Sequence, residues 1–177
     1  MRIFSSVQSD VTDRAARDLG FVRAYDENLT LGALGFAGFD YERAPAIAGQ
    51  TQSWRLNNPA GSTRGALTTA IEVLCNAART AQVHIASPAA GDLATALTEV
   101  NRSAGGAAAQ VAFSFATGQG VIGNQVVATR AQAAVPYVVK TIFELPINST
   151  LQVDFRDGTI VVGDRMSINV AWVEGVT

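Results

Sequence analysis

The sequence predicts an all-β fold, mainly β with one or two short helices, built as a single jelly-roll barrel or sandwich of about eight antiparallel strands. Hydrophobicity alternates with a period of two at 151–155 and again at 166–172, as is typical of strands with one buried face. Asp157-Gly158 lies between these two runs and supplies turn residues. Short β-type runs recur along most of the chain, at 47–56, 82–86, 110–117, 121–129, 137–145, 151–155, 159–162 and 167–173.

The N-terminal part of the chain is predicted to be less regular. A capping-box pattern at Asp10–Asp13 indicates a short helix that ends near Leu19. Residues 21–41 combine large apolar side chains with glycines and show no clear period, so we expect an arm that packs along a sheet or over a neighbouring subunit. The interface residues predicted in this arm are Leu31, Leu34, Phe36 and Phe39.

A chain of 177 residues fits a single domain, large enough to bury its own core. We expect the arm to span 1–41 and the jelly-roll barrel to span 42–177. Within the barrel, a helical insertion is predicted around 63–102. The small residues at 103–109 predict an exposed loop.

The helical insertion depends on two patterns. Apolar residues at 66–81 recur at helical spacing, which predicts one helix. A hairpin with strands at 71–74 and 83–85 is the competing interpretation of the same segment. Asp92 is a candidate N-cap for a second short helix, whose apolar face would carry Leu93, Leu97 and Val100.

The predicted core is formed by the inward side chains of the two C-terminal runs. Alternation places five apolar residues on the same side of their strands, namely Val153 and the core anchors Phe155, Ile168, Val170 and Trp172. Trp54 shares the parity of Gln50 and Gln52 in its run. We therefore expect Trp54 to be half-exposed.

Charged residues make up only 16% of the chain, hydrophobic residues make up 48%, and the formal net charge is −2. Soluble domains usually contain about 25% charged residues, so we expect neighbouring subunits to cover part of the surface. The slightly acidic balance argues against direct binding of nucleic acid. The N-terminal segment lacks the apolar core of a signal peptide, and no window is apolar enough to span a bilayer, so we expect synthesis in a cytoplasm without membrane insertion.

The residues carry no catalytic, metal-binding or cofactor-binding signature. Gly118–Gly123 has the G-x-G-x-x-G spacing of a phosphate-binding loop, but a β-branched run follows it instead of a helix, so a glycine-rich hairpin turn is predicted. His84 is the only histidine and Cys75 the only cysteine. Histidine-based triads, zinc sites with histidine ligands and intrachain disulfides therefore lack the residues they need. We therefore expect that the protein is not an enzyme and that it binds no cofactor.

Carboxylates leave two other kinds of site open. Glu144 and Asp154, on neighbouring β runs, are the best candidates for a glycosidase pair. Asp154, Asp157 and Asp164 could supply oxygen ligands to a calcium ion between loops. Their spacing matches no defined calcium loop, and solvated turn residues are the commoner explanation.

Residues 145–155, the turn at Asp157-Gly158 and the run at 166–172 resemble the closing strands of viral single-jelly-roll coat proteins. The sequence looks most similar to the smaller major capsid proteins of icosahedral bacteriophages that enclose a membrane. This resemblance implies a structural subunit of a virion, made in the host cytoplasm, which assembles into an icosahedral shell. It also implies contacts with copies of itself, with a second coat protein and with an internal membrane, and it implies no catalytic residues.

Two other function classes stay open beside the capsid subunit. A carbohydrate- or receptor-binding β module of a viral spike or tail would be favoured by exposed aromatic side chains clustered at one end of the barrel. A carboxylate-dependent glycosidase would be favoured by two carboxylates that face each other in a cleft.

Overall fold

The computed structural model describes residues 34–102 and 107–176 of the chain. These residues form two antiparallel sheets, each six-stranded, and contain no helix. The predicted all-β jelly roll is confirmed, but without the short helices, and the helix predicted at 10–19 lies outside the described residues. The strands are β1 (Gly35–Arg43), β2 (Gln52–Asn58), β3 (Gly65–Cys75), β4 (Arg79–Ala86), β5 (Thr95–Ala96), β6 (Glu99–Asn101), β7 (Ala112–Thr117), β8 (Asn124–Ala131), β9 (Tyr137–Val139), β10 (Glu144–Leu145), β11 (Ser149–Phe155) and β12 (Met166–Val176).

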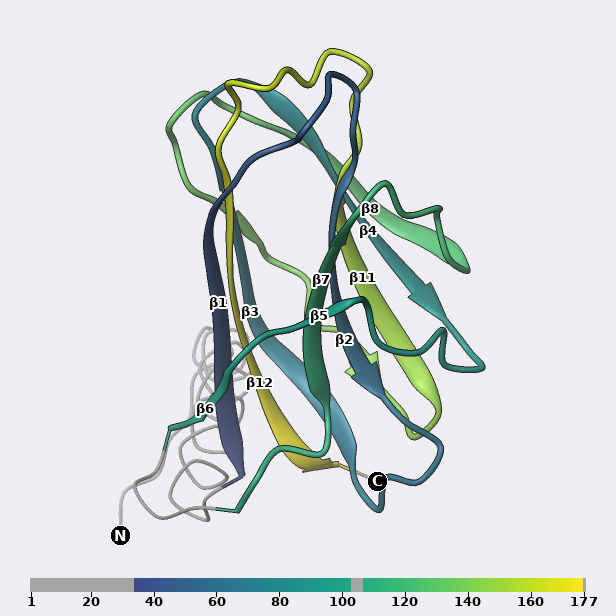
Figure 1. Ribbon diagram of the computed structural model, residues 1–177. Helices are drawn as coiled ribbons and strands as arrows, with labels where there is room; N and C mark the ends of the chain where they lie inside the picture. Colours follow the sequence, from purple (N-terminus) through teal and green to yellow (C-terminus); the bar gives the residue numbers. More distant parts are fainter. Residues whose placement is uncertain (1–33, 103–106, 177) are drawn as a thin grey trace, which may run out of the picture.

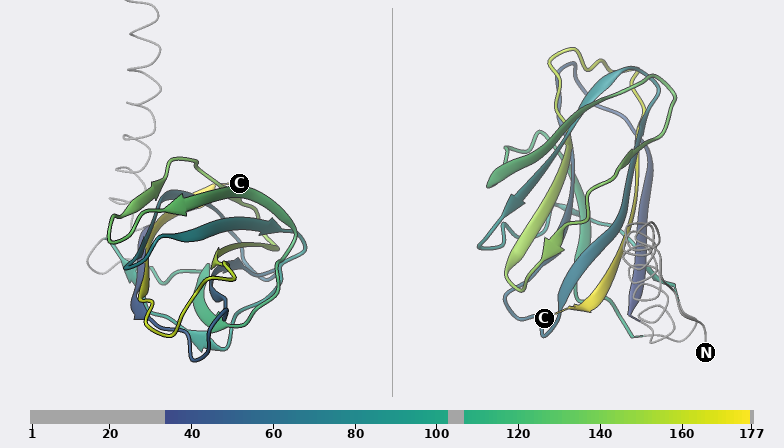
Figure 2. Two further views of the ribbon diagram at one scale, coloured as in Figure 1. Left: turned by 90° about the horizontal axis from the view of Figure 1, so that it is seen from above. Right: turned by 180° about the vertical axis from the view of Figure 1, so that it is seen from behind.

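The strand order identifies the jelly roll. Sheet A has the order β10-β3-β12-β1-β6, with β9 also paired to β3, and sheet B has the order β5-β7-β2-β11-β4-β8. When the short additions β5 and β6 and the neighbouring β7 are set aside, the chain passes between the two sheets at nearly every connection. The two layers face each other in Figure 1, and the views in Figure 2 show them enclosing a common interior.

The segment 66–81, predicted as a helix, instead forms β3 in sheet A and the start of β4 in sheet B. The prediction was wrong because β3 contains a bulge: its pairing with β12 skips Thr69. Inward-facing residues therefore change from even positions, such as Thr68, to odd positions, such as Ile71 and Val73. The resulting apolar spacing imitates that of a helix. The competing hairpin was also wrong, because β3 and β4 do not pair with each other.

The remainder of the predicted helical insertion at 63–102 is also extended. β5 pairs with β7 in sheet B, and β6 pairs with β1 in sheet A. Asp92 caps no helix in the structure, and its Oδ1 accepts a hydrogen bond from Asn57 Nδ2 at 2.9 Å. The short segments satisfy their backbone groups by pairing with longer strands, so a helix is not needed.

The boundary predicted between an arm at 1–41 and the barrel falls inside β1. This strand lies between β12 and β6 in sheet A, and Phe36 pairs with Trp172. Residues 35–41 are thus part of the sheet, whereas 1–33 lie outside the described residues. The inward-facing positions of β1 include Gly38 and Asp40, and this mixture of residue types hid the period-two pattern.

The core lies between the two sheets and contains Phe155, Ile168, Val170 and Trp172, as the alternation predicted. Trp54 is buried there too, although it was predicted to be half-exposed. Its ring packs against Phe115 and Phe155, with centroids 5.2 and 6.2 Å apart. The parity argument failed because Gln52, on the same side of β2, is itself buried, and its amide nitrogen donates to the carbonyls of Gln50 and Thr51.

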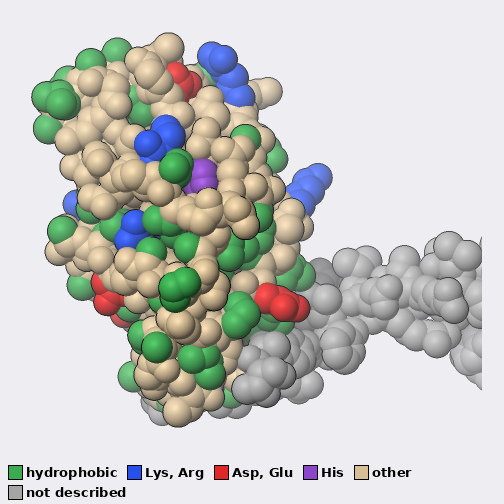
Figure 3. Space-filling model, turned by 90° about the vertical axis from the view of Figure 1, so that its right-hand side faces the viewer, with side chains coloured by type: hydrophobic (Ala, Val, Ile, Leu, Met, Phe, Trp, Pro, Cys, Tyr) green, Lys and Arg blue, Asp and Glu red, His purple; other side chains and the backbone are tan. Residues whose placement is uncertain are grey.

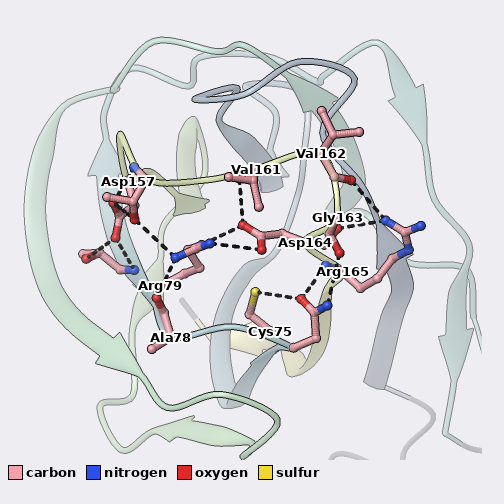
Figure 4. A network of polar contacts seen from close by, with 12 residues as sticks. Cys75, Ala78, Arg79, Asp157, Val161, Val162, Gly163, Asp164 and Arg165 are labelled. Carbon is pink, nitrogen blue, oxygen red and sulfur yellow. Dashed lines mark hydrogen bonds and ion pairs between the residues drawn. The ribbon is translucent and has the colours of Figure 1, made fainter.

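The loop between β11 and β12 is fastened to the corner where the chain passes from β3 to β4 (Figure 4). Arg79 forms two hydrogen bonds to the carboxylate of Asp164, at 2.6 and 3.1 Å. The carboxylate of Asp157 accepts hydrogen bonds from Thr80 and Thr159. The run at 159–162, predicted as a strand, belongs to this loop.

Candidate functional site

The outer face of sheet A carries exposed apolar side chains, which we call the sheet-A patch: Phe39, Tyr41, Val100 and Val138. Phe39 is 48% exposed and Tyr41 is 63% exposed. Their rings lie in contact, with centroids 5.3 Å apart. Single exposed apolar residues are ordinary, but an aromatic pair with valines on the same sheet face is a candidate contact surface.

The members of the patch lie on both sides of sheet A. One cross-strand row runs from Phe39 on β1, through Asn169 on β12 and Glu72 on β3, to Val138 on β9, so two polar residues separate Val138 from the aromatic pair. Val100 on β6 lies opposite Ala37 on β1, and alternation places Ala37 on the same face as Phe39. The patch is therefore a sheet surface and not the tip of a loop.

Contacts beneath β1 hold the aromatic pair in place. Asp40 points inward, and its Oδ2 accepts hydrogen bonds from Trp54 Nε1 and from Arg43 Nε, both at 2.7 Å. The guanidinium of Arg43 lies 4.5 Å from the centre of the Phe115 ring. Both Trp54 and Phe115 belong to sheet B, so these contacts connect β1 to the opposite layer and fix which of its residues face outward.

The predicted interface residues differ in how exposed they are in the structure. Phe39 is exposed in the sheet-A patch, whereas Phe36 is buried in the core, stacked on Trp172 with ring centroids 5.8 Å apart. The interface assignment of Phe36 was therefore wrong, because β1 turns alternate side chains inward. Leu34 is half-buried, and Leu31 lies outside the described residues. The prediction missed Tyr41, although the alternation of 35–43 carried that signal.

Sheet B has a different outer face, because its polar side chains are buried. We call Arg55, His84, Gln152, Asp154 and Arg156 the sheet-B polar layer. Arg55 Nε donates to Gln152 Oε1 at 2.6 Å, and Gln152 Nε2 donates to both carboxylate oxygens of Asp154 at 3.0 and 2.9 Å. The same carboxylate lies 3.7 Å from His84 Nε2 and 3.6 Å from Arg156 Nη2.

Two connections that cross the sheet cover this layer. Residues 87–94 lead from β4 to β5, and residues 118–123 lead from β7 to β8, in each case between opposite parts of sheet B. Arg55 Nη1 donates to the carbonyls of Ala90 and Gly91, and Gln152 Nε2 donates to the carbonyl of Gly120. The polar side chains thus satisfy backbone groups of the crossing segments, and for that reason they are buried instead of facing water.

The glycine-rich segment at 118–123 is one of these crossing connections. It was predicted as a hairpin turn, but β7 and β8 lie far apart in the strand order of sheet B, so the hairpin was wrong. Gly123 has a φ of +43°, and a Cβ built there would lie 2.0 Å from the carbonyl oxygen of Ile85. Glycine is required here because the connection passes directly against β4.

Burial governs the charge of the imidazole in the polar layer. It lowers the pKa of His84, the nearby Asp154 opposes this effect, and Arg156 lowers the pKa further. His84 Nε2 lies 3.2 Å from Gln82 Oε1. Within the described ranges, His84 Nδ1 and Arg156 Nε have no hydrogen-bond partner. The polar network is therefore not fully paired, and burial favours the neutral imidazole within it.

The carboxylates considered for catalysis or calcium binding do not converge. Glu144 lies on β10 at the edge of sheet A and is exposed, whereas Asp154 is buried on sheet B, so the two form no pair across a cleft. Asp157 and Asp164 are occupied by the loop contacts of Figure 4. Among the residues that the structure describes, no cluster of His, Cys, Asp and Glu could hold a metal ion.

Cys75 is a buried free thiol at the end of β3. Burial raises the pKa of this thiol, and its Sγ donates to Asn76 Oδ1 at 3.7 Å. A protonated, buried thiol is a poor nucleophile. Cys75 ends β3 in sheet A, whereas His84 lies on β4 in sheet B, and each makes its side-chain contact with a different residue.

No helix in the described ranges is long and apolar enough to cross a lipid bilayer. The comparisons with known proteins add no relative: no family model, no curated protein and no solved structure matches this chain.

Proposed function

We propose that this protein is a structural subunit of a viral coat and contacts neighbouring subunits through the outer face of sheet A. The observation that carries the proposal is the sheet-A patch, in which large apolar side chains on the strands of a jelly roll are exposed to solvent. The strand order supports it, because it is the order expected from the resemblance of 145–172 to the closing strands of viral coat proteins.

The apolar side chains of the patch and the composition of the chain favour a contact with another protein over a surface that stays in water. Covering one large apolar side chain contributes roughly 1.5–3 kcal/mol, so burial of Phe39 and Tyr41 offers a substantial gain on association. Charged residues make up only 16% of the chain, which suits a subunit whose surface is partly covered in an assembly. The net charge of −2 suits contact with protein or lipid better than contact with a nucleic acid.

The test is assembly of the full chain. We expect purified protein to form oligomers or particles as its concentration rises, measured by sedimentation velocity and electron microscopy. The double variant Phe39→Ser/Tyr41→Ser should no longer form particles, while keeping the wild-type circular dichroism and thermal unfolding. The matched control Ile147→Ser/Val162→Ser removes two exposed apolar side chains elsewhere and should assemble normally. A wild-type chain that stays monomeric throughout, or a patch variant that assembles fully, would contradict the proposal.

One observation favours a second candidate, a carbohydrate- or receptor-binding module. The contacting rings of Phe39 and Tyr41 form an exposed aromatic platform of the kind on which sugars stack. In that case the wild-type chain would remain monomeric and bind immobilised glycans. The same Phe39→Ser/Tyr41→Ser variant would then abolish glycan binding, which separates this function from the coat subunit.

A further inference from the structure

Strand β8 is the long open edge of the described structure. Every other strand at a sheet edge has two or three residues, namely β5, β6, β9 and β10, whereas β8 has eight. It pairs with β4 on one side only and ends the order of sheet B, at the right-hand side of Figure 1. An edge strand presents backbone N–H and C=O groups on its free side, so its chemistry matches another extended strand.

The sequence of β8 lacks most of the features that usually protect such an edge. Proteins block edges with charges, prolines, bulges or inward-pointing charged residues, and β8 has only a bulge near Val126. β8 contains no proline, and its only charged residue is Arg130 near its C-terminal end. Val126 is 45% exposed and Ala128 is also exposed. On this side of the molecule, hydrophobic side chains lie between scattered charged ones (Figure 3).

The single charge makes β8 compatible with a second copy of itself. In an antiparallel pair related by a two-fold axis, each residue lies opposite a residue at the mirrored position. Arg130 would then face an uncharged residue in every register except the one centred on Arg130 itself. Like charges directly opposite each other would oppose pairing, and this strand avoids them.

We propose that two copies of this chain associate through antiparallel pairing of β8 with β8, which joins their B sheets into one continuous sheet. The bulge in the β4–β8 ladder lies near Val126, and pairing with β4 is regular from Val127 to Ala131. This regular part keeps an unbroken register, so its free side can accept a further strand. The surface is separate from the sheet-A patch, and the pairing does not depend on the coat function.

Charges introduced on the exposed side of β8 test the proposal directly. The variant Val126→Lys/Ala128→Lys adds two positive charges beside Arg130, so registers centred on Val127, Ala128 or Thr129 all place like charges opposite each other. We expect its association constant, measured by sedimentation equilibrium, to fall about tenfold or more. Mixing it with Val126→Asp/Ala128→Asp should restore association. Both positions are exposed, so the fold should survive, as checked by circular dichroism.

The control Val121→Lys/Val162→Lys adds the same charge at exposed positions outside β8 and should associate like the wild type. Backbone amides of Val126–Arg130 should also exchange with solvent more slowly in the dimer than in the dilute monomer. A wild-type chain with no self-association, a Lys variant that associates normally, or unchanged amide exchange would each overturn the proposal. The variant Phe39→Ser/Tyr41→Ser should keep this dimer, so loss of the lattice contact and loss of the β8 pairing can be told apart.

Discussion

Removal of the indole of Trp172 is expected to be the most damaging single change in the core. The side chain has no exposed surface, stacks on Phe36, and donates from Nε1 to Glu174 Oε1 at 3.3 Å. Replacing a buried aromatic residue by alanine costs about 3–5 kcal/mol through lost burial and the cavity left behind. The ring pair with Phe36 accounts for about 1 kcal/mol of this. Because total stability is about 5–15 kcal/mol, Trp172→Ala should lose at least about a fifth of it.

The measurement is equilibrium unfolding of the full chain in urea, followed by circular dichroism. We expect a clear fall in the midpoint for Trp172→Ala with an unchanged slope, since the folded state should remain the same. Phe39→Ala is the matched aromatic control at an exposed position and should change stability by no more than about 0.5 kcal/mol. Equal midpoints for Trp172→Ala and the wild type would refute the assignment of Trp172 to the core.

Three further predictions concern the loops and the polar layer. Gly123→Ala should destabilise by about 2 kcal/mol or more in thermal unfolding, because its Cβ would meet the carbonyl of Ile85; a stable variant would mean that the crossing connection can move. Hydrogen bonds from Thr159 lower the pKa of Asp157 from 3.8 to about 2, which corresponds to about 2.4 kcal/mol before screening. Solvent screening of this partly exposed carboxylate reduces the effect, so about 1 kcal/mol of stability, present above pH 3.8, should disappear as the pH falls towards 2; Asp157→Asn should show a smaller acid loss. The lowered pKa of His84 means that stability should decline as the pH falls below 6.5, and His84→Gln should flatten this decline in pH-dependent melting; a profile unchanged in His84→Gln would contradict this.

The C-terminal half of the fold could be predicted because its signals are local. In β11 and β12, alternate residues face the core without interruption over the predicted runs, so the period of two reports which side chains point inward. In β3, by contrast, the bulge at Thr69 changes the parity within one strand. A local pattern cannot distinguish that change from the spacing of a helix.

The polar layer could not be predicted, because it depends on which segments cross the sheet. Gln152 and Asp154 alternate with apolar residues, as they would on a strand that faces water. Their burial follows from the route of residues 87–94 and 118–123, which is a property of the strand order and leaves no local trace. The exposure of Tyr41 follows from the alternation along β1. That alternation was not recognised in the sequence, because Gly38 and Asp40 occupy inward-facing positions where apolar residues are expected.

The position of β12 ties completion of the fold to the last strand in chain order. All strands of sheet B precede residue 156, so this layer can form while the chain is still being made. Sheet A cannot, because β1 and β3 have no common neighbour until 166–176 has emerged from the ribosome. Until then Phe36 and Ile71 lack their neighbours on β12, Trp172 and Val170. A shortened chain that ends before Met166 would therefore lack an ordered sheet-A patch.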